Sequence, residues 1–259
     1  MLRKLSGLLL VAALTFSGLD SMAQKNTVVA HRGSWKNTNV PQNSIASLKH
    51  AIDQGCLGSE FDVHMTADGI PVVNHDHTEG DLDIEKVTLA ELHQFKHKNG
   101  EVIPTLESYL LAGKGQKNTT LVLEIKTSRL GKARSLELTE KCVALVKKHK
   151  MQKMVDYIAF DYDVCKKVKE LDAKAHIAYL NGDVAPAKLK EDKIDGLDYH
   201  HSVLRKNENW IQEAKDLKLT LNVWTVNKKE DMEWFLDKKF DFITTDEPEL
   251  LLELSKKKK

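Results

Sequence analysis

Short apolar segments alternate with longer amphipathic segments along the chain from Thr27 onward. The short apolar segments have the length and composition of strands, and the longer amphipathic segments have the pattern of helices. Strands that alternate with helices indicate parallel βαβ units, and about 236 residues suffice for one α/β barrel. The pattern therefore predicts a (β/α)8 barrel, although it contains nine candidate strands: Val28–His31, Leu57–Val63, Val72–His75, Leu121–Ile125, Tyr157–Phe160, Ala175–Leu180, Gly196–Tyr199, Leu221–Val226 and Phe242–Thr244.

The surplus strand is explained by the short connection between Val63 and Val72. A crossover helix between parallel strands needs at least about 10 residues, so these two strands must form an antiparallel hairpin. Asp68-Gly69 is a favoured two-residue turn. That turn predicts His75 opposite Asp62, on a hairpin at the mouth of the barrel.

Residues 77–103 do not fit the alternation of strands and helices. Thr88 to Glu91 form a capping box that predicts one short helix. We expect a small insertion at about 77–103, packed near the barrel mouth.

The first 23 residues have the pattern of a secretory signal peptide. Arg3 and Lys4 precede the apolar run Leu8 to Phe16, and Ala23 ends a small-residue cleavage pattern. This run is too short to span a bilayer core of about 30 Å. We therefore expect cleavage after Ala23, a mature domain at 24–259, no stable membrane anchor and a periplasmic or secreted location; a buried first helix is the alternative.

The remaining charge is balanced. Without residues 1–23 the chain carries 37 basic and 37 acidic residues, and four of the basic ones are the terminal lysines 256–259. No basic excess is left to bind a nucleic-acid backbone. Cys56, Cys142 and Cys165 show no paired spacing, so we expect buried apolar residues with no chemical role.

Four groups of polar residues stand near the carboxyl ends of predicted strands, the face that carries the active site in (β/α)8 enzymes. Glu60 and Asp62 are two positions apart, so both side chains point to the same side of a strand. Each group alone has a simpler interpretation, such as an exposed strand edge or a local ion pair. Their occurrence together predicts an active site: His31-Arg32, Glu60-Phe61-Asp62, His75-Asp76 and Glu124-Ile125-Lys126.

These residue types favour phosphodiester cleavage over sugar or peptide chemistry. Carboxylates without cysteine favour one hard divalent cation, Mg²⁺ or Ca²⁺. Histidines can exchange protons near neutral pH. Arg32 and Lys126 can bind an anionic group, the arginine through a two-pronged contact to phosphate.

The sequence resembles the glycerophosphodiester phosphodiesterase family from residue 28 to residue 250. The matching segments are His31-Arg32-Gly33, Pro41-Gln42-Asn43-Ser44, Glu60-Phe61-Asp62-Val63, Thr66-Ala67-Asp68-Gly69, Val72-Val73-Asn74-His75-Asp76, Ile103-Pro104-Thr105-Leu106-Glu107, Leu123-Glu124-Ile125-Lys126, Trp224-Thr225-Val226-Asn227 and Ile243-Thr244-Thr245-Asp246-Glu247-Pro248. The resemblance implies hydrolysis of a small glycerophosphodiester to sn-glycerol 3-phosphate and an alcohol.

The resemblance also implies a role for individual residues. The family's catalytic histidines fall on His31 and His75, for which we expect roles as base and acid. Its phosphate-facing cations fall on Arg32 and Lys126, and Trp224 matches an aromatic residue of the substrate pocket, with ordinary barrel packing as the alternative. Its metal ligands fall on Glu60, Asp62 and Glu124.

One position departs from the family. Gln42 stands where the family usually has glutamate, which removes a negative charge but none of the expected metal ligands. Other functions consistent with the sequence are a related barrel phosphodiesterase acting on phospholipid or lysophospholipid, and a non-catalytic phosphodiester-binding protein. The head group, the choice between Mg²⁺ and Ca²⁺, the oligomeric state and the nucleophile, either water or the neighbouring glycerol hydroxyl, are left open.

Overall fold

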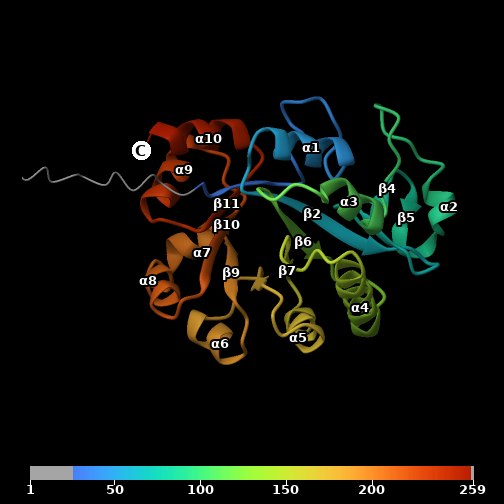
Figure 1. Cartoon of the computed structure of the whole chain (residues 1–259). Helices are drawn as coiled ribbons and strands as arrows, with labels where there is room; N and C mark the ends of the chain where they lie inside the picture. Colours follow the sequence, from blue (N-terminus) through green and yellow to red (C-terminus); the bar gives the residue numbers. More distant parts are fainter. Residues whose placement is uncertain (1–25, 258–259) are drawn as a thin grey trace, which may run out of the picture.

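A computed structural model describes residues 26–257, in which eight parallel strands close into a barrel (Figure 1). The sheet order is β1-β11-β10-β9-β8-β7-β6-β2, and β1 pairs with β2 to complete the ring. The predicted signal peptide lies outside the described residues. The barrel strands are β1 (Val28–Ala30), β2 (Gly58–Met65), β6 (Thr120–Ile125), β7 (Val155–Ala159), β8 (Ile177–Tyr179), β9 (Gly196–His200), β10 (Thr220–Trp224) and β11 (Phe242–Thr245).

Helices surround the barrel, as the alternating pattern predicts. Ser44 caps the first of them by accepting a hydrogen bond from the Ser47 backbone N–H, and Gly55, with a φ of +76°, follows its end. The outer helices are α1 (Ile45–Asp53), α3 (Leu106–Gly113), α4 (Lys132–Lys148), α5 (Tyr162–Leu171), α6 (Pro186–Glu191), α7 (His201–Lys206), α8 (Asn209–Asp216), α9 (Lys229–Asp237) and α10 (Pro248–Lys257). The predicted (β/α)8 barrel is thus confirmed.

Strand side chains alternate between two apolar layers. One set, which includes Phe61 and Val63 of β2, packs with the helices in the main core. The other set lies inside the barrel, where Val29, Val122 and Ile158 form a separate cluster. A Cβ at Gly58 would lie 3.0 Å from the Val29 side chain and 3.3 Å from the Val122 side chain, so these side chains would have to shift to accept it. The period of two therefore decides which residues enter the barrel.

The ninth strand, β3 (Pro71–Val73), pairs antiparallel with β2, which confirms the predicted hairpin. Its predicted register is wrong by one residue. The loop has three residues and ends at Gly69, whose φ is +79°, because the Thr66 carbonyl accepts from the Gly69 N–H and the Thr66 N–H donates to the Ile70 carbonyl. Asn74, not His75, therefore lies opposite Asp62, and its backbone N–H donates to the Asp62 carbonyl at 3.0 Å.

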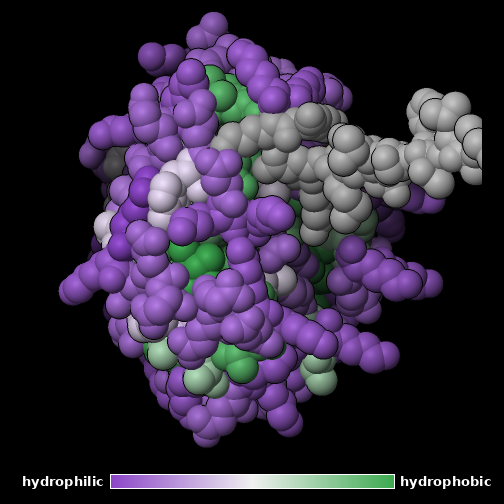
Figure 2. Space-filling model, turned by 90° about the vertical axis from the view of Figure 1, so that its left-hand side faces the viewer, coloured by the Kyte–Doolittle hydropathy of each residue, from purple (hydrophilic) through white to green (hydrophobic). Residues whose placement is uncertain are grey.

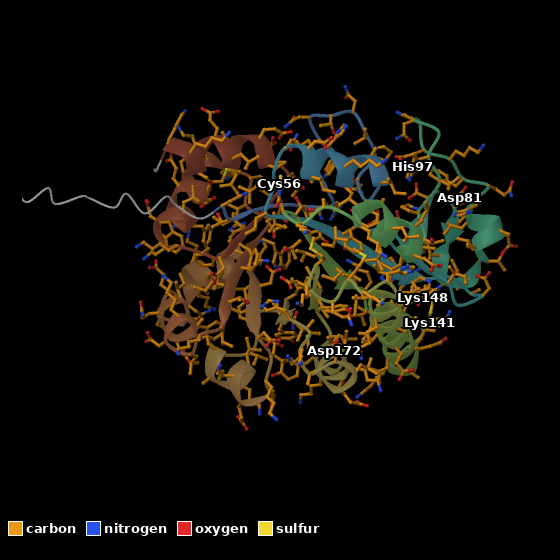
Figure 3. All side chains as sticks on the ribbon, viewed as in Figure 1. Cys56, Asp81, His97, Lys141, Lys148 and Asp172 are labelled. Atoms are coloured by element: carbon orange, nitrogen blue, oxygen red, sulfur yellow. The ribbon has the colours of Figure 1, made fainter. Side chains whose placement is uncertain are left out.

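Residues 77–103 form a small substructure at the edge of the molecule (Figure 1). They contain β4 (Thr78–Glu79), β5 (Leu82–Asp83), a 3-10 helix (Ile84–Lys86) and α2 (Leu89–Leu92), the last with the predicted capping box of Thr88 and Glu91. Val72, Ile84, Leu92 and Ile103 make a core of their own. Figure 3 shows Asp81 and His97 on this substructure, at the periphery.

One face of the molecule is mostly polar (Figure 2), and the three cysteines are buried. Hydrophilic side chains predominate on the face in Figure 2, where hydrophobic residues form separate spots. Cys56, Cys142 and Cys165 are buried and unpaired, as expected. No helix within residues 26–257 is long and apolar enough to cross a bilayer.

Candidate active site

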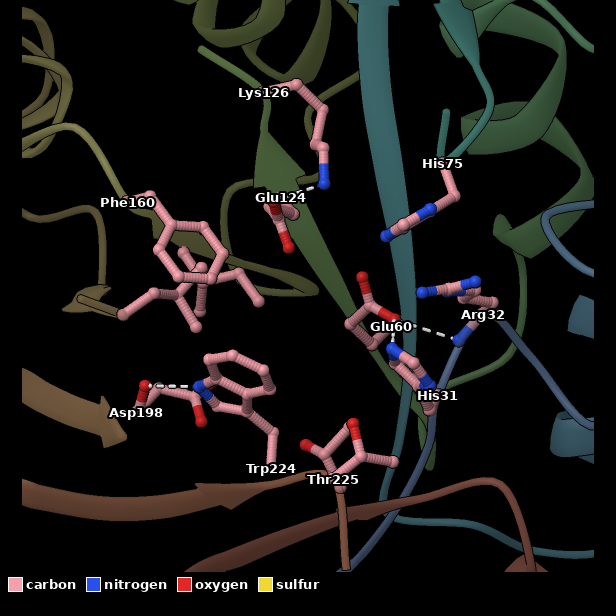
Figure 4. Close-up of a pocket in the computed structure, with 13 residues that line it drawn as sticks. His31, Arg32, Glu60, His75, Glu124, Lys126, Phe160, Asp198, Trp224 and Thr225 are labelled. Atoms are coloured by element: carbon pink, nitrogen blue, oxygen red, sulfur yellow. Dashed lines mark hydrogen bonds and ion pairs between the residues drawn. The ribbon is translucent and has the colours of Figure 1, made fainter. Parts of the chain in front are cut away.

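The inward-facing residues at the carboxyl ends of the strands surround a cavity of about 290 Å³ (Figure 4). This volume is at the lower end of the range for small-molecule sites. Seven of the eight predicted site residues line the cavity, and Asp62 lies buried directly beside it. The seven are His31, Arg32, Glu60, His75, Glu124, Lys126 and Trp224.

Three carboxylates converge at one wall of the cavity. Asp62 and Glu124 are paired in register on the neighbouring strands β2 and β6, and Glu60 is two residues before Asp62 on the same face. One oxygen from each carboxylate lies within 4.8 Å of the other two. All three side chains are buried, at 2%, 1% and 8% exposure for Glu60, Asp62 and Glu124.

Two cationic side chains border these carboxylates. The Lys126 Nζ donates to Asp62 Oδ1 at 3.1 Å and lies 2.8 Å from Glu124 Oε1. The Arg32 Nε lies 3.9 Å from Asp62 Oδ2. Arg32 has a φ of +57°, and this turn directs its backbone N–H to Glu60 Oε2 at 2.8 Å.

The pKa values of the carboxylates differ because their neighbours differ. Burial, followed by the charge of Asp62, raises the pKa of Glu60 well above its usual range. The same two causes raise the pKa of Glu124 to about 7. Burial also acts on Asp62 and is the largest single cause, but the charges of Lys126, His75 and Arg32 together with the Asn43 hydrogen bond outweigh it and lower the Asp62 pKa. Three clustered carboxylates cannot all ionise without additional positive charge.

The donor set fits a divalent cation. Glu60 Oε1 is buried and has no hydrogen-bond partner within residues 26–257, although a buried carboxylate oxygen normally has one. Three convergent carboxylates provide the hard oxygen ligands that Mg²⁺ and Ca²⁺ bind. The Glu60/Asp62/Glu124 group is therefore consistent with a divalent metal.

His31 is anchored by a carboxylate from the far end of the chain. Its Nδ1 lies 2.7 Å from Oδ1 of Asp246, the residue after β11. Although burial alone would raise the pKa of Asp246, the hydrogen bond and charge of His31 lower it, so this carboxylate is ionised and accepts a hydrogen bond from Nδ1–H. The opposite ring nitrogen, Nε2, faces the cavity and lies 4.0 Å from Glu60 Oε2.

His75 repeats this arrangement on the hairpin. Its Nδ1 lies 2.7 Å from Asp76 Oδ1, and its backbone carbonyl contacts the His64 ring at 3.0 Å. Because β3 ends at Val73 and the chain bends there, the side chain of His75 turns into the cavity despite the shifted register. Burial lowers the pKa of His75.

The segment before α1 supports the site with uncharged amides. Asn43, with a φ of +55°, donates through Nδ2 to Asp62 Oδ2 at 2.9 Å and accepts from the Asp62 backbone N–H at 3.1 Å. Gln42 accepts a hydrogen bond from Arg32 Nη1 at 2.9 Å. Gln42 thus holds the arginine without adding negative charge.

The opposite half of the cavity is mainly apolar. Figure 4 places Phe160, Trp224 and Asp198 across from His31, Arg32 and His75. The Trp224 Nε1 donates to the Asp198 carbonyl at 2.9 Å, and its ring meets Phe160 edge to face at 5.5 Å. Trp224 is thus a fixed wall of the cavity.

Sequence reasoning missed the supporting roles of Asp246 and Asp198. Asp246 directly follows the last barrel strand, and the rule that locates sites at strand ends could have identified it. Asp198 interrupts an apolar strand at an inward-facing position, which is a weaker signal. The pairing of Asp246 with His31 could not be predicted because 215 residues separate them.

The chain is similar to proteins of one family over most of its length. The model of the glycerophosphoryl diester phosphodiesterase family matches residues 31–250. A glycerophosphodiester phosphodiesterase of Caldanaerobacter subterraneus is 32% identical over 248 residues, which cover 90% of this chain and 99% of the relative.

Two solved structures extend the comparison. A glycerophosphodiester phosphodiesterase from Parabacteroides distasonis is 43% identical and superposes with a TM-score of 0.86, covering 88% of this chain and 96% of that one. A phosphodiesterase from Oleispira antarctica, solved in complex with the product sn-glycerol-3-phosphate, is 27% identical with a TM-score of 0.75, covering 88% and 95%.

Proposed function

The chain belongs to the glycerophosphodiester phosphodiesterase family of phosphoric diester hydrolases, and we propose that it cleaves glycerophosphodiesters to sn-glycerol 3-phosphate and an alcohol in a metal-dependent reaction. One observation carries this proposal. Three buried carboxylates face two histidines, each anchored through Nδ1 to a carboxylate, around one small cavity. The product bound to the Oleispira relative supports the same chemistry here.

The metal would be held by Glu60, Asp62 and Glu124. When bound, a divalent cation would stabilise the negative charge that develops on the phosphoryl oxygens. Arg32 and Lys126 would bind the same phosphate group and orient it for attack. Gln42 fixes Arg32 for this task without cancelling its charge.

The histidines would transfer the protons. His31 projects Nε2 beside Glu60, with Nδ1 donating to Asp246, so Nε2 is the ring position that can accept the proton of the nucleophile. His75 approaches from the hairpin and would protonate the departing alcohol. Trp224 and Phe160 would contact the carbon atoms of the substrate.

The size of the cavity supports one class of substrate, and the N-terminal sequence supports one location. The cavity of about 290 Å³ favours a small water-soluble diester over an intact phospholipid. We propose a periplasmic or secreted enzyme because residues 1–23 have the signal-peptide pattern.

Product analysis tests the proposed function. The purified protein, supplied with Mg²⁺ or Ca²⁺, should release sn-glycerol 3-phosphate from glycerophosphocholine, glycerophosphoethanolamine or glycerophosphoinositol. Lysophosphatidylcholine, assayed in parallel, should react much more slowly. Faster cleavage of the lysolipid would contradict the proposed substrate class, and binding of all substrates without turnover would contradict catalysis.

A further inference from the structure

Asp198 is a buried acidic residue of the cavity that the proposed mechanism does not use. It is the third residue of β9, and it faces the barrel interior with 1% of its surface exposed. It lines the same cavity as Glu60 and Glu124. Its position on β9 places it one layer deeper than the strand end at His200.

The two oxygens of this carboxyl group differ in their hydrogen bonds. Asn222 Nδ2 donates to Asp198 Oδ2 at 2.8 Å. The orientation of this amide is fixed because Asn222 Oδ1 accepts from the backbone N–H of Val223 at 2.8 Å. Asp198 Oδ1 is buried and has no hydrogen-bond partner within residues 26–257. A buried polar atom without a partner lowers stability, so the fold alone does not explain this oxygen.

The surroundings of Asp198 suit an uncharged group that carries a hydroxyl. Ile158, Leu180 and Trp224 line the cavity beside it, whereas Arg32 and Lys126 lie across the cavity. The cations that would bind an anionic phosphate are therefore on the other side of the cavity from Asp198 (Figure 4). Burial, with the charge of Glu124, raises the pKa of Asp198 well above its usual range, and both protonation states can bond to a hydroxyl.

The single unpartnered oxygen of Asp198 also indicates which neutral or cationic group of a ligand would fit beside it. A primary ammonium group needs several acceptors when it is buried, and a quaternary ammonium group donates no hydrogen bond. One hydroxyl group satisfies one oxygen. The flat face of Trp224, held by the Asp198 carbonyl, can cover the adjoining carbon atoms.

Building on the proposed function, we propose that Asp198 binds the terminal hydroxyl of the glycerol moiety and thereby determines substrate specificity. The glycerol then occupies the enclosed half of the cavity against Trp224 and Leu180. The variable alcohol points toward the open mouth of the barrel. The 2-hydroxyl, one carbon closer to the phosphate, lies nearer the metal-binding carboxylates.

The test compares two substrates that differ in one hydroxyl. The first is glycerophosphocholine, and the second is the phosphocholine diester of propane-1,2-diol, esterified through its primary oxygen. Both keep the 2-hydroxyl. We expect the wild-type protein to favour the first by about 10- to 100-fold in kcat/KM. Asp198→Ala should lose that factor on glycerophosphocholine and stay within about threefold of wild type on the analogue.

Two further variants separate binding from folding. Asp198→Asn keeps an amide that can donate to the hydroxyl, and it should retain most of the discrimination. Asp156→Asn, at the amino-terminal end of β7 and two strands away from β9, removes an acidic group outside the cavity and should leave both rates unchanged. Equal losses by Asp198→Ala on both substrates would indicate a structural role and would overturn the proposal.

The wild-type protein provides a test that needs no variant. It should be inhibited about 10-fold or more strongly by sn-glycerol 3-phosphate than by propane-1,2-diol 1-phosphate. Equal inhibition, with glycerophosphocholine still hydrolysed, overturns the role of Asp198 alone. Absence of hydrolysis by the metal-supplied wild type overturns the proposed function, and this inference with it.

Discussion

Replacing Asp246 by asparagine should inactivate His31 by changing which of its ring nitrogens carries the proton. The carboxylate at position 246 accepts a hydrogen bond from His31 Nδ1–H at 2.7 Å. An asparagine side chain has nearly the same shape but offers one acceptor and one donor. The effect of the substitution therefore depends on which end of the new amide faces the histidine.

Asn227 determines that orientation. Its Oδ1 accepts from the backbone N–H of Asp246 at 2.9 Å and from Thr245 Oγ1 at 3.2 Å, so its Nδ2 must face position 246. That Nδ2 donates to Asp246 Oδ2 at 2.7 Å. In Asp246→Asn the amide oxygen must take this place, and the new NH₂ group then donates to His31 Nδ1. The histidine proton moves to Nε2, which can no longer accept a proton from the nucleophile.

If His31 is the general base, as proposed, the substitution removes the contribution of that base to kcat. We expect kcat for glycerophosphocholine to fall by about 10²–10⁴-fold in Asp246→Asn. The same exchange in Ser-His-Asp proteases lowers kcat by about 10⁴ through the wrong tautomer. Asp246→Ala leaves both tautomers accessible and should remain roughly 10-fold more active than the asparagine variant.

Steady-state kinetics at saturating metal give the measurement, with thermal unfolding as a check on folding. Glu247→Gln makes the same chemical change one residue away, where the carboxylate pairs with Lys36, and should keep near-wild-type kcat. An asparagine variant as active as wild type, or more active than the alanine variant, would refute the tautomer argument.

Three other predictions concern the metal, the histidines and the support of Asp62. Chelation should abolish activity and Mg²⁺ or Ca²⁺ restore it, while Glu60→Gln and Asp62→Asn stay folded but nearly inactive; full activity of verified metal-free protein would exclude a metal role. His31→Ala and His75→Ala should each lose about 10²–10⁴-fold on an alkyl diester, but only His75→Ala should recover on a nitrophenyl diester of glycerol, whose leaving group needs no acid. Recovery by His31→Ala instead would reverse the two roles. Asn43→Ala should lower the free energy of unfolding by about 2–4 kcal/mol in urea denaturation, and Asn43→Gly by about 1 kcal/mol less because glycine tolerates a φ of +55°; equal losses would exclude backbone strain.

The barrel could be predicted from the sequence because its signals are local. Each of the nine predicted strands ends within two residues of its observed bounds, since hydrophobic runs and helix caps are encoded by neighbouring residues. That Glu60 and Asp62 share one face could also be predicted, because side chains two positions apart on a strand point to the same side. Local patterns were therefore enough to predict strand bounds and side-chain faces, which depend on a single element.

The predicted register of the hairpin was wrong for a reason that also lies in neighbouring residues. Asp68-Gly69 is compatible with a two-residue or a three-residue loop, and the two differ in whether Ala67 belongs to the strand. Thr66 selects the longer loop, because its Oγ1 contacts Asp68 Oδ1 at 2.6 Å and accepts from the Ile70 N–H at 3.0 Å. Side-chain hydrogen bonds of this kind decide between turns that the backbone alone allows.

Gln42 stands where the family usually has glutamate, and the charges around Arg32 explain the effect of this difference. Arg32 approaches Asp62 at 3.9 Å and donates to Gln42 Oε1 at 2.9 Å. A glutamate in place of Gln42 could accept the same hydrogen bond, but its charge would offset that of the arginine and would add to three buried carboxylates. The neutral amide keeps the geometry of Arg32 and leaves more of its positive charge for a phosphate. The departure from the family residue therefore changes the electrostatic potential around Arg32, while the arrangement of Glu60, Asp62 and Glu124 stays the same.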